Sequence, residues 1–105
     1  IIFSAIKKKD MDFYGIESGD LDGVIDQLRV TEGVECALFL YEKTEGQFKV
    51  SLRSNGKVDV RKIAEQFGGG GHVKAAGCTV EGNVRDIVNS ISPLIDQQLE
   101  QGKDV

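Results

Sequence analysis

The sequence has little of the residue types from which metal centres and disulfide frameworks are built. Its 105 residues include one histidine and two cysteines, and the cysteines belong to no Cys-x-x-Cys pair. A standard structural zinc site cannot be assembled from these ligands. Cys36 and Cys78 lie among apolar or small neighbours. We therefore expect two buried thiols in a reducing compartment, which predicts a cytoplasmic protein.

Long apolar runs are also missing. No run approaches the ~20 residues needed to span a bilayer, so we expect no membrane segment. The sequence starts at Ile1 without a basic and apolar leader. We interpret the chain as a fragment of a longer protein.

An excess of positive charge is absent. Lys and Arg number 13 against 17 Asp and Glu, for a net charge of −4. Most of the basic side chains fall within residues 36–80, on both sides of an unusual glycine run. An acidic protein with one locally basic segment suits a small anionic ligand better than a long duplex.

The apolar pattern predicts a chain of short strands and amphipathic helices. Apolar or alternating runs predict strands over residues 1–6, 34–41, 47–53 and 78–80. Residues 10–19 are polar and glycine-punctuated, which predicts a connection without secondary structure. Apolar residues spaced i, i+3, i+4 and i+7 predict helical faces at residues 21–28 and 60–67, and a last amphipathic helix follows at 84–99.

Each predicted helix has a polar capping residue before it: Ser18 or Asp20, then Asp59, then Asn83. Gly33 should end the region of the first helix. Pro93 should kink the last helix or restart it, with Ser92 as a new cap. The order β-α-β-β-α-β-α describes one compact α/β domain over residues 1–105. It predicts a mixed sheet of about four strands with a central antiparallel hairpin and flanking helices.

The most unusual peptide is the run Gly68, Gly69, Gly70 and Gly71, followed by His72. Four glycines carry a large entropic cost on folding, so stability alone would not select them. The spacing fits neither a Walker A loop nor a dinucleotide fingerprint. Bare backbone amides can form a concave nest for an anion, with the imidazole beside them. The alternative is a helix C-cap extended by flexible residues, with an exposed His72.

Arg53 and Ser54 end the alternating strand, and 13 residues separate Ser54 from the glycine run. A guanidinium is a bidentate phosphate ligand, and a hydroxyl is a further donor. One helix fits in the interval, so both segments should return to the same edge of the sheet. Lys74 would add a third charge. The alternatives are a solvated edge arginine and an ordinary surface lysine.

Catalytic machinery is not evident. The acidic residues form no Asp-x-Asp, Asp-His-His or His-Glu-x-x-His arrangement, and no serine or cysteine has an evident base beside it. We therefore expect no catalytic residue and no metal ligand in this chain. The sequence predicts a domain that holds a phosphate group but does not cleave it.

Five short motifs resemble the DHH-associated (DHHA) domain, the C-terminal half of DHH-family phosphoesterases. They are VSLRS at 50–54, VDV at 58–60, IA at 63–64, FGGGGH at 67–72 and AAGC at 75–78. The stretch around residues 32–42 and the end of the glycine run are most similar to the nanoRNase and pAp phosphatase branch. The resemblance covers residues 1–90.

The resemblance implies a division of labour between two domains. In that family a larger N-terminal DHH domain holds two Mn²⁺ ions and activates water, and the DHHA domain closes over the cleft and grips the nucleotide. By this resemblance Arg53 and Ser54 would hold a substrate phosphate, and Gly69 to Gly71 would line the nucleotide. His72 would reach a phosphate near the metals.

The implied partners are a nucleotide or short RNA, such as pAp or a linear dinucleotide, and the protein's own DHH domain. A homodimer is left open. Because this chain lacks the DHH half, we expect it to be inactive alone, with Mn²⁺ belonging to the absent domain. The alternative function is a non-catalytic nucleic-acid-binding or dimerisation module, like the DHHA-like domains of alanyl-tRNA synthetases.

Overall fold

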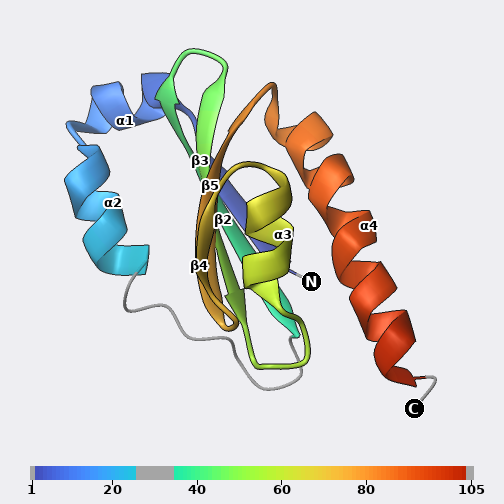
Figure 1. Cartoon of the computed structure of the whole chain (residues 1–105). Coiled ribbons are helices and arrows are strands. Elements are labelled where there is room, and N and C mark those ends of the chain that lie inside the picture. The colour runs from blue at the N-terminus through green and yellow to red at the C-terminus, as the bar shows by residue number, and fades with distance from the viewer. Residues whose placement is uncertain (1, 26–34, 104–105) are drawn as a thin grey trace.

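The computed structural model describes residues 2–25 and 35–103, in which a five-stranded sheet carries helices on both faces (Figure 1). The elements, in chain order, are β1 (Ile2–Ile6), α1 (Lys8–Tyr14), α2 (Ser18–Ile25), β2 (Cys36–Thr44), β3 (Gln47–Ser54), α3 (Val60–Gln66), β4 (Gly70–His72), β5 (Ala75–Glu81) and α4 (Val84–Lys103). The strand order is β1-β2-β3-β5-β4. β1 is parallel to β2, and the other neighbouring pairs are antiparallel. The predicted mixed α/β domain with a central hairpin is confirmed.

Two elements differ from the prediction. Helix α1 occupies part of the predicted connection over 10–19, and it buries only Met11, so its sequence carries little apolar periodicity. The glycine run contributes a fifth strand, because Gly70–His72 pair with β5 as the short edge strand β4. Because glycine has low β-propensity, the sequence pattern did not predict this strand. Three predictions concern residues outside the described ranges: Leu28 on the first helical face, Gly33 at the end of that region, and residue 34 at the start of the next strand.

One face of the sheet forms the main core with α3 and α4. Its buried side chains come from alternate positions of β2, β3 and β5, among them Leu40, Val50 and Cys78. Asp59 caps α3 by accepting a hydrogen bond from the Lys62 amide at 3.2 Å. Asn83 caps α4 in the same way for the Asp86 amide, at 2.8 Å. These two predicted caps are confirmed, whereas the predicted cap at Ser18 or Asp20 is wrong, because both residues lie inside α2.

Helix α4 continues through Pro93 from Val84 to Lys103, so the predicted restart at Ser92 is wrong. Ile91 and Ile95, on either side of the proline, are fully buried against the sheet, whereas Pro93 is exposed. Packing on both sides therefore holds the helix together although the proline removes one backbone donor.

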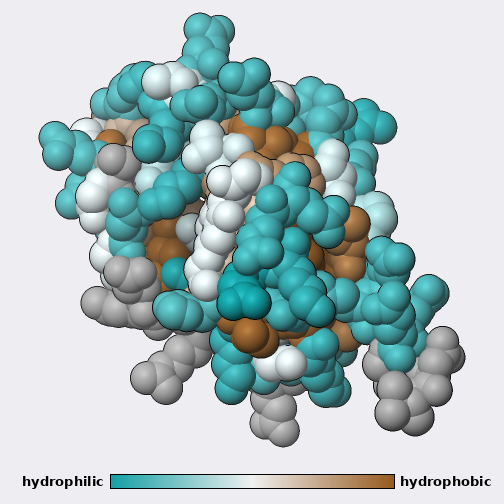
Figure 2. Space-filling model, viewed as in Figure 1, coloured by the Kyte–Doolittle hydropathy of each residue, from teal (hydrophilic) through white to brown (hydrophobic). Residues whose placement is uncertain are grey.

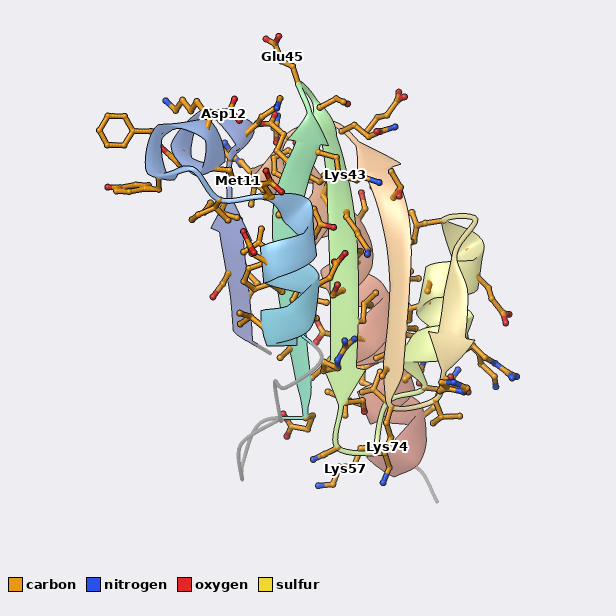
Figure 3. The ribbon with its side chains drawn as sticks, turned by 90° about the vertical axis from the view of Figure 1, so that its left-hand side faces the viewer. Met11, Asp12, Lys43, Glu45, Lys57 and Lys74 are labelled. Carbon is orange, nitrogen blue, oxygen red and sulfur yellow. The ribbon has the colours of Figure 1, made fainter. Side chains whose placement is uncertain are left out.

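The other face of the sheet is covered only at one side. Helices α1 and α2 lie over β1 and β2, where Met11, Ile25 and Tyr41 form a second small core (Figure 3). Within the described ranges, no helix lies over β5 and β4 on this face (Figure 1). The fold therefore leaves the polar side of β3 open beside the glycine strand.

Candidate functional site

Strand β3 presents a row of polar side chains to the open face. Phe48, Val50 and Leu52 are buried in the main core, as the alternation predicts. The side chains between them line the other face of the sheet. There Lys49 and Arg53 are half-buried, and Ser51 is buried. In the sheet register, Ser51 lies opposite Gly77 of β5, and Gly77 lies opposite Gly70 of β4. Glycines in the two neighbouring strands leave space beside the polar row.

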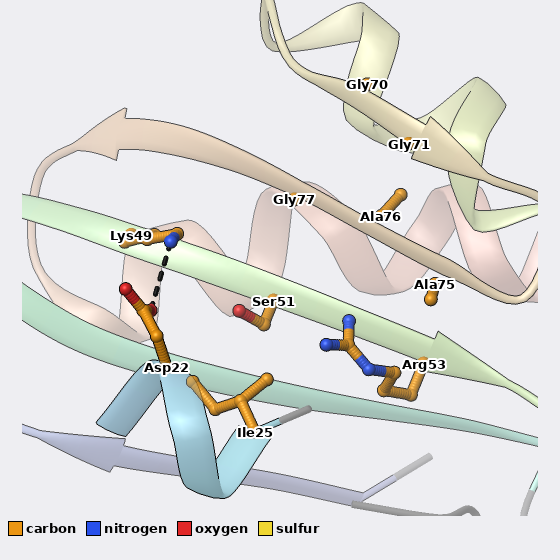
Figure 4. A pocket seen from close by; sticks show the side chains of 10 residues that line it. All are labelled: Asp22, Ile25, Lys49, Ser51, Arg53, Gly70, Gly71, Ala75, Ala76 and Gly77. Carbon is orange, nitrogen blue, oxygen red and sulfur yellow. Dashed lines mark hydrogen bonds and ion pairs between the residues drawn. The ribbon is translucent and has the colours of Figure 1, made fainter. Parts of the chain in front are cut away.

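This space is a cavity of about 450 Å³ between α2 and β4, here called the Arg53 cavity (Figure 4). It is lined by Asp22, Ile25, Lys49, Ser51, Arg53, Gly70, Gly71, Ala75, Ala76 and Gly77. The Arg53 side chain extends back along β3 toward Ser51 (Figure 4). Its Nη1 donates a hydrogen bond to the Leu52 carbonyl at 3.0 Å. The guanidinium is thereby oriented within the cavity.

An ion pair closes one end of the Arg53 cavity. Lys49 Nζ donates to Asp22 Oδ1 at 3.0 Å, and the Tyr41 hydroxyl donates to the same oxygen at 3.0 Å. The hydrogen bond from Lys49 holds the pKa of Asp22 below its ordinary value. Burial opposes the charged form of Lys49, but the hydrogen bond to Asp22 and the nearby charges outweigh it and raise the Lys49 pKa. Burial, followed by the hydrogen bond to Asp22, raises the pKa of Tyr41.

The glycines are needed where β4 approaches β5. A Cβ on Gly69 would overlap the Gly77 carbonyl oxygen, and one on Gly71 would lie 2.6 Å from the Ala76 Cα. Gly71 also has a φ of 144°, which other residues rarely adopt. By contrast, a Cβ on Gly70 would meet nothing within 4 Å among the described atoms. Close strand packing explains Gly69 and Gly71, and the open cavity lies beside Gly70.

A second cavity of about 390 Å³ adjoins the first. It is lined by Lys49, Phe67, Gly68, Gly69, Gly70, Gly77, Cys78 and Thr79. Figure 2 shows a pale strip along this face, where Figure 1 places β4, with a hollow beside it and hydrophilic surface on both sides. The glycine run therefore borders two hollows.

The structure brings only some of the predicted site residues together. Arg53, Gly70 and Gly71 line the Arg53 cavity, and Gly68 and Gly69 line the second cavity. The remaining three predicted residues line neither of these two cavities.

Ser54 lies on the core face, where its hydroxyl accepts hydrogen bonds from the Gly56 and Val58 amides at 3.0 and 3.3 Å. His72 is exposed on β4, opposite Ala75. Lys74 is exposed in the turn before β5, at the end of the sheet where Lys57 lies (Figure 3). Ser54 therefore stabilises a turn, and His72 and Lys74 lie at the rim of the sheet.

Seven residues that line the Arg53 cavity were not among the predicted site residues: Asp22, Ile25, Lys49, Ser51, Ala75, Ala76 and Gly77. The alternation of β3 places Lys49 and Ser51 on the same face of the sheet as Arg53. Both could therefore have been predicted from the sequence as neighbours of Arg53. Asp22 carries no local signal, because only the packing of α2 across the sheet brings it to Lys49.

Two further features of the described part of the chain concern metal binding and membrane insertion. No group of three or more His, Cys, Asp or Glu side chains there is arranged to hold a metal ion. No helix of the described part has both the length and the apolar character needed to cross a membrane.

Comparison with known proteins identifies relatives over most of the chain. The model of the DHHA1 domain family matches residues 2–100. The bifunctional oligoribonuclease and PAP phosphatase NrnA of Thermus thermophilus is 46% identical over 63 residues, which cover 60% of this chain and 19% of that protein. The crystal structure of an exopolyphosphatase-related protein from Bacteroides fragilis overlays with a TM-score of 0.72 at 30% identity.

That overlay covers 97% of this chain and 29% of the Bacteroides protein, so the chain spans less than a third of the Thermus and Bacteroides proteins. The C-Ala domain of the Aquifex aeolicus alanyl-tRNA synthetase overlays with a TM-score of 0.64 at 12% identity. It covers 90% of this chain, and this chain covers 89% of it. At that identity the likeness is one of fold alone.

Proposed function

The chain belongs to the DHHA1 domain family, and from this premise we propose that it binds a phosphate group of a nucleotide or short oligonucleotide in the Arg53 cavity. In this proposal the domain is the substrate-gripping accessory domain of a DHH-family phosphoesterase. Its substrates are of the class named for its relatives: oligoribonucleotides and pAp.

The observation that carries the proposal is the placement of Arg53. Its guanidinium lies in a cavity of about 450 Å³ with glycine backbone on the far wall. Cavities of about 300–1,000 Å³ hold small ligands, and a planar fork of N–H donors matches the oxygens of a phosphate. Ser51 supplies a hydroxyl at the base of the same cavity. Glycine walls let a ligand approach the backbone closely.

Bond cleavage is assigned to another domain in this proposal. The described residues offer no cluster that fits the Mn²⁺ ions of DHH phosphoesterases. The metal ions and the activated water would therefore be supplied by a DHH domain of the same protein, and the residues described above would hold the nucleotide. We expect the chain alone to leave pAp intact in the presence of Mn²⁺.

Titration calorimetry with adenosine 3′,5′-bisphosphate tests the binding proposal. The Arg53→Ala variant should bind about ten- to a hundred-fold more weakly, because a charge-assisted hydrogen bond is worth about 1.5–3 kcal/mol. Arg61→Ala is the matched control, because Arg61 pairs with Glu65 on the exposed side of α3, away from the cavity. Equal affinities of the two variants would overturn the proposal.

A non-catalytic nucleic-acid-binding module is the second candidate, supported by the fold likeness to the C-Ala domain. The net charge of −4 disfavours a long polyanion as the ligand. The same titration separates the two: tighter binding of a structured RNA than of the bisphosphate, with no dependence on Arg53, would favour this candidate.

A further inference from the structure

Strand β1 is the outermost strand of the sheet, on the side opposite β4 (Figure 3). Its five residues, IFSAI, include no charged side chain and no proline. Phe3, Ser4 and Ala5 are all exposed, and Phe3 is 51% exposed. One side of β1 pairs with β2, and within the described ranges no strand pairs with its other side. The outer backbone N–H and C=O groups of β1 are therefore open to a further strand.

The two edges of the sheet differ in how well they resist such pairing. Soluble proteins protect an exposed edge by keeping it short or by placing charges and prolines on it. The β4 edge is three residues long, whereas β1 has five and carries its nearest charges only after its end, in the lysines at 7–9. An uncharged edge strand with an exposed aromatic ring is a surface to which another strand adds.

The sequence of β1 is complementary to itself in the antiparallel direction. When two copies run antiparallel with Ser4 opposite Ser4, all five positions are paired, and Phe3 of each copy lies opposite Ala5 of the other. A large side chain then meets a small one on the same face of the joined sheet. The two copies are related by a two-fold axis at Ser4, which is the isologous arrangement of a closed dimer.

The charges at the two ends of β1 are also complementary between copies. Ile2 pairs with Ala37 in the parallel register, so Glu35 lies just beyond the N-terminal end of β1. In the antiparallel pair, that end lies beside the C-terminal end of the other β1, where the lysines follow. Lys8 already pairs with Asp12, so the lysines on either side of it are the ones that approach Glu35 of the other copy. Symmetry repeats this attraction at both ends of the paired strands.

We propose that the protein forms a two-fold symmetric dimer in which the β1 strands of two copies pair antiparallel and join their sheets into one. β1 and β4 are opposite edges of each sheet, so this pairing leaves the β4 side of the Arg53 cavity open in both copies. The dimer does not depend on which ligand the cavity binds.

Sedimentation equilibrium of the chain over a wide range of concentration tests the dimer. The apparent mass should rise from the 11.4 kDa of one chain to twice that value and no further. Phe3→Lys and Ala5→Lys should each raise the dissociation constant by at least about ten-fold, because a lysine on an edge strand opposes the addition of another strand. Val73→Lys is the matched control, because Val73 is also exposed but lies between β4 and β5. A constant mass of one chain, growth beyond two chains, or equal weakening by Val73→Lys would overturn the proposal.

A disulfide cross-link tests the register without relying on the lysine variants. Ser4→Cys should give a covalent dimer in a glutathione redox buffer, because opposed residues of antiparallel strands have Cα atoms about 4.5–5.5 Å apart, which a disulfide spans. The native Cys36 and Cys78 are buried and do not compete. Ser90→Cys, exposed on α4, should stay unlinked on a non-reducing gel. Failure of Ser4→Cys to cross-link, or equal cross-linking of Ser90→Cys, would overturn the pairing through β1.

Discussion

The carboxylate of Asp22 and the ammonium of Lys49 meet across the open face of the sheet, with 3.0 Å between Oδ1 and Nζ. The contact attaches α2 to β3 beside the Arg53 cavity (Figure 4). The buried Tyr41 donates to the same carboxylate oxygen, so the pair rests on the small core under α2. Both charged side chains are partly exposed, so water screens their attraction, and their main effect is to fix the position of the lysine.

The first prediction concerns the acid titration of this pair. The hydrogen bond from Lys49 lowers the pKa of Asp22 from 3.8. A carboxyl group with a lowered folded-state pKa stabilises the fold at pH values above its unfolded pKa. That contribution is lost as the pH falls below about 3.8 and through the lowered pKa. Carboxyl ¹³C NMR should show the Asp22 midpoint below 3.8, and Lys49→Met should move it upward. An unmoved midpoint in the variant would rule out Lys49 as the cause.

A second prediction separates the two serines of β3. Ser54→Ala should lower the free energy of unfolding by about 1–2 kcal/mol, because the Gly56 and Val58 amides lose their acceptor. It should leave nucleotide affinity unchanged. Ser51→Ala should weaken nucleotide binding severalfold, because Ser51 lines the Arg53 cavity. Urea unfolding and calorimetry measure the two effects, and a reversed pattern would show that Ser54 faces the ligand.

The positions of Ser51 and Ser54 in the structure show what could and could not be predicted from the sequence. The alternation in β3 fixes which side chains share a face, so Arg53 and Ser54 necessarily point to opposite sides. The motif that placed them together as phosphate ligands ignores this period of two. Lys49 and Ser51 follow from the same period and were predictable.

Other parts of the candidate site could not be predicted from local sequence patterns. Asp22 reaches the cavity through the crossing of α2 over the sheet, which is a tertiary contact with no periodic signal. The extra strand β4 depends on its pairing with β5, because Gly70 and Gly71 carry no side chain to indicate a strand. The caps Asp59 and Asn83, by contrast, are local hydrogen bonds and were predicted correctly.

A third prediction concerns the thiols. Cys36 and Cys78 are buried on the core face, and this burial raises the pKa of each to about 11. At pH 8 only about one thiol in a thousand is then a thiolate, which is the reactive form. Iodoacetamide should label both cysteines slowly in the folded chain and rapidly in urea, as mass spectrometry can follow. Rapid labelling of the folded chain would contradict the buried placement.

The last prediction separates the structural glycines from the one beside the ligand. Gly71→Ala should lower the free energy of unfolding by at least about 1–3 kcal/mol. Its φ of 144° is strained for alanine, and the new Cβ would crowd Ala76.

Gly70→Ala should leave stability unchanged or raise it by up to about 1 kcal/mol, because its φ is not positive and its Cβ meets no described atom within 4 Å. Since Gly70 borders both cavities, the added methyl should still weaken nucleotide binding severalfold. Gly19→Ala on α2, which also has open space around its Cβ but lines neither cavity, should leave affinity unchanged. Full affinity in Gly70→Ala would mean that the glycine run serves only the packing of β4 on β5.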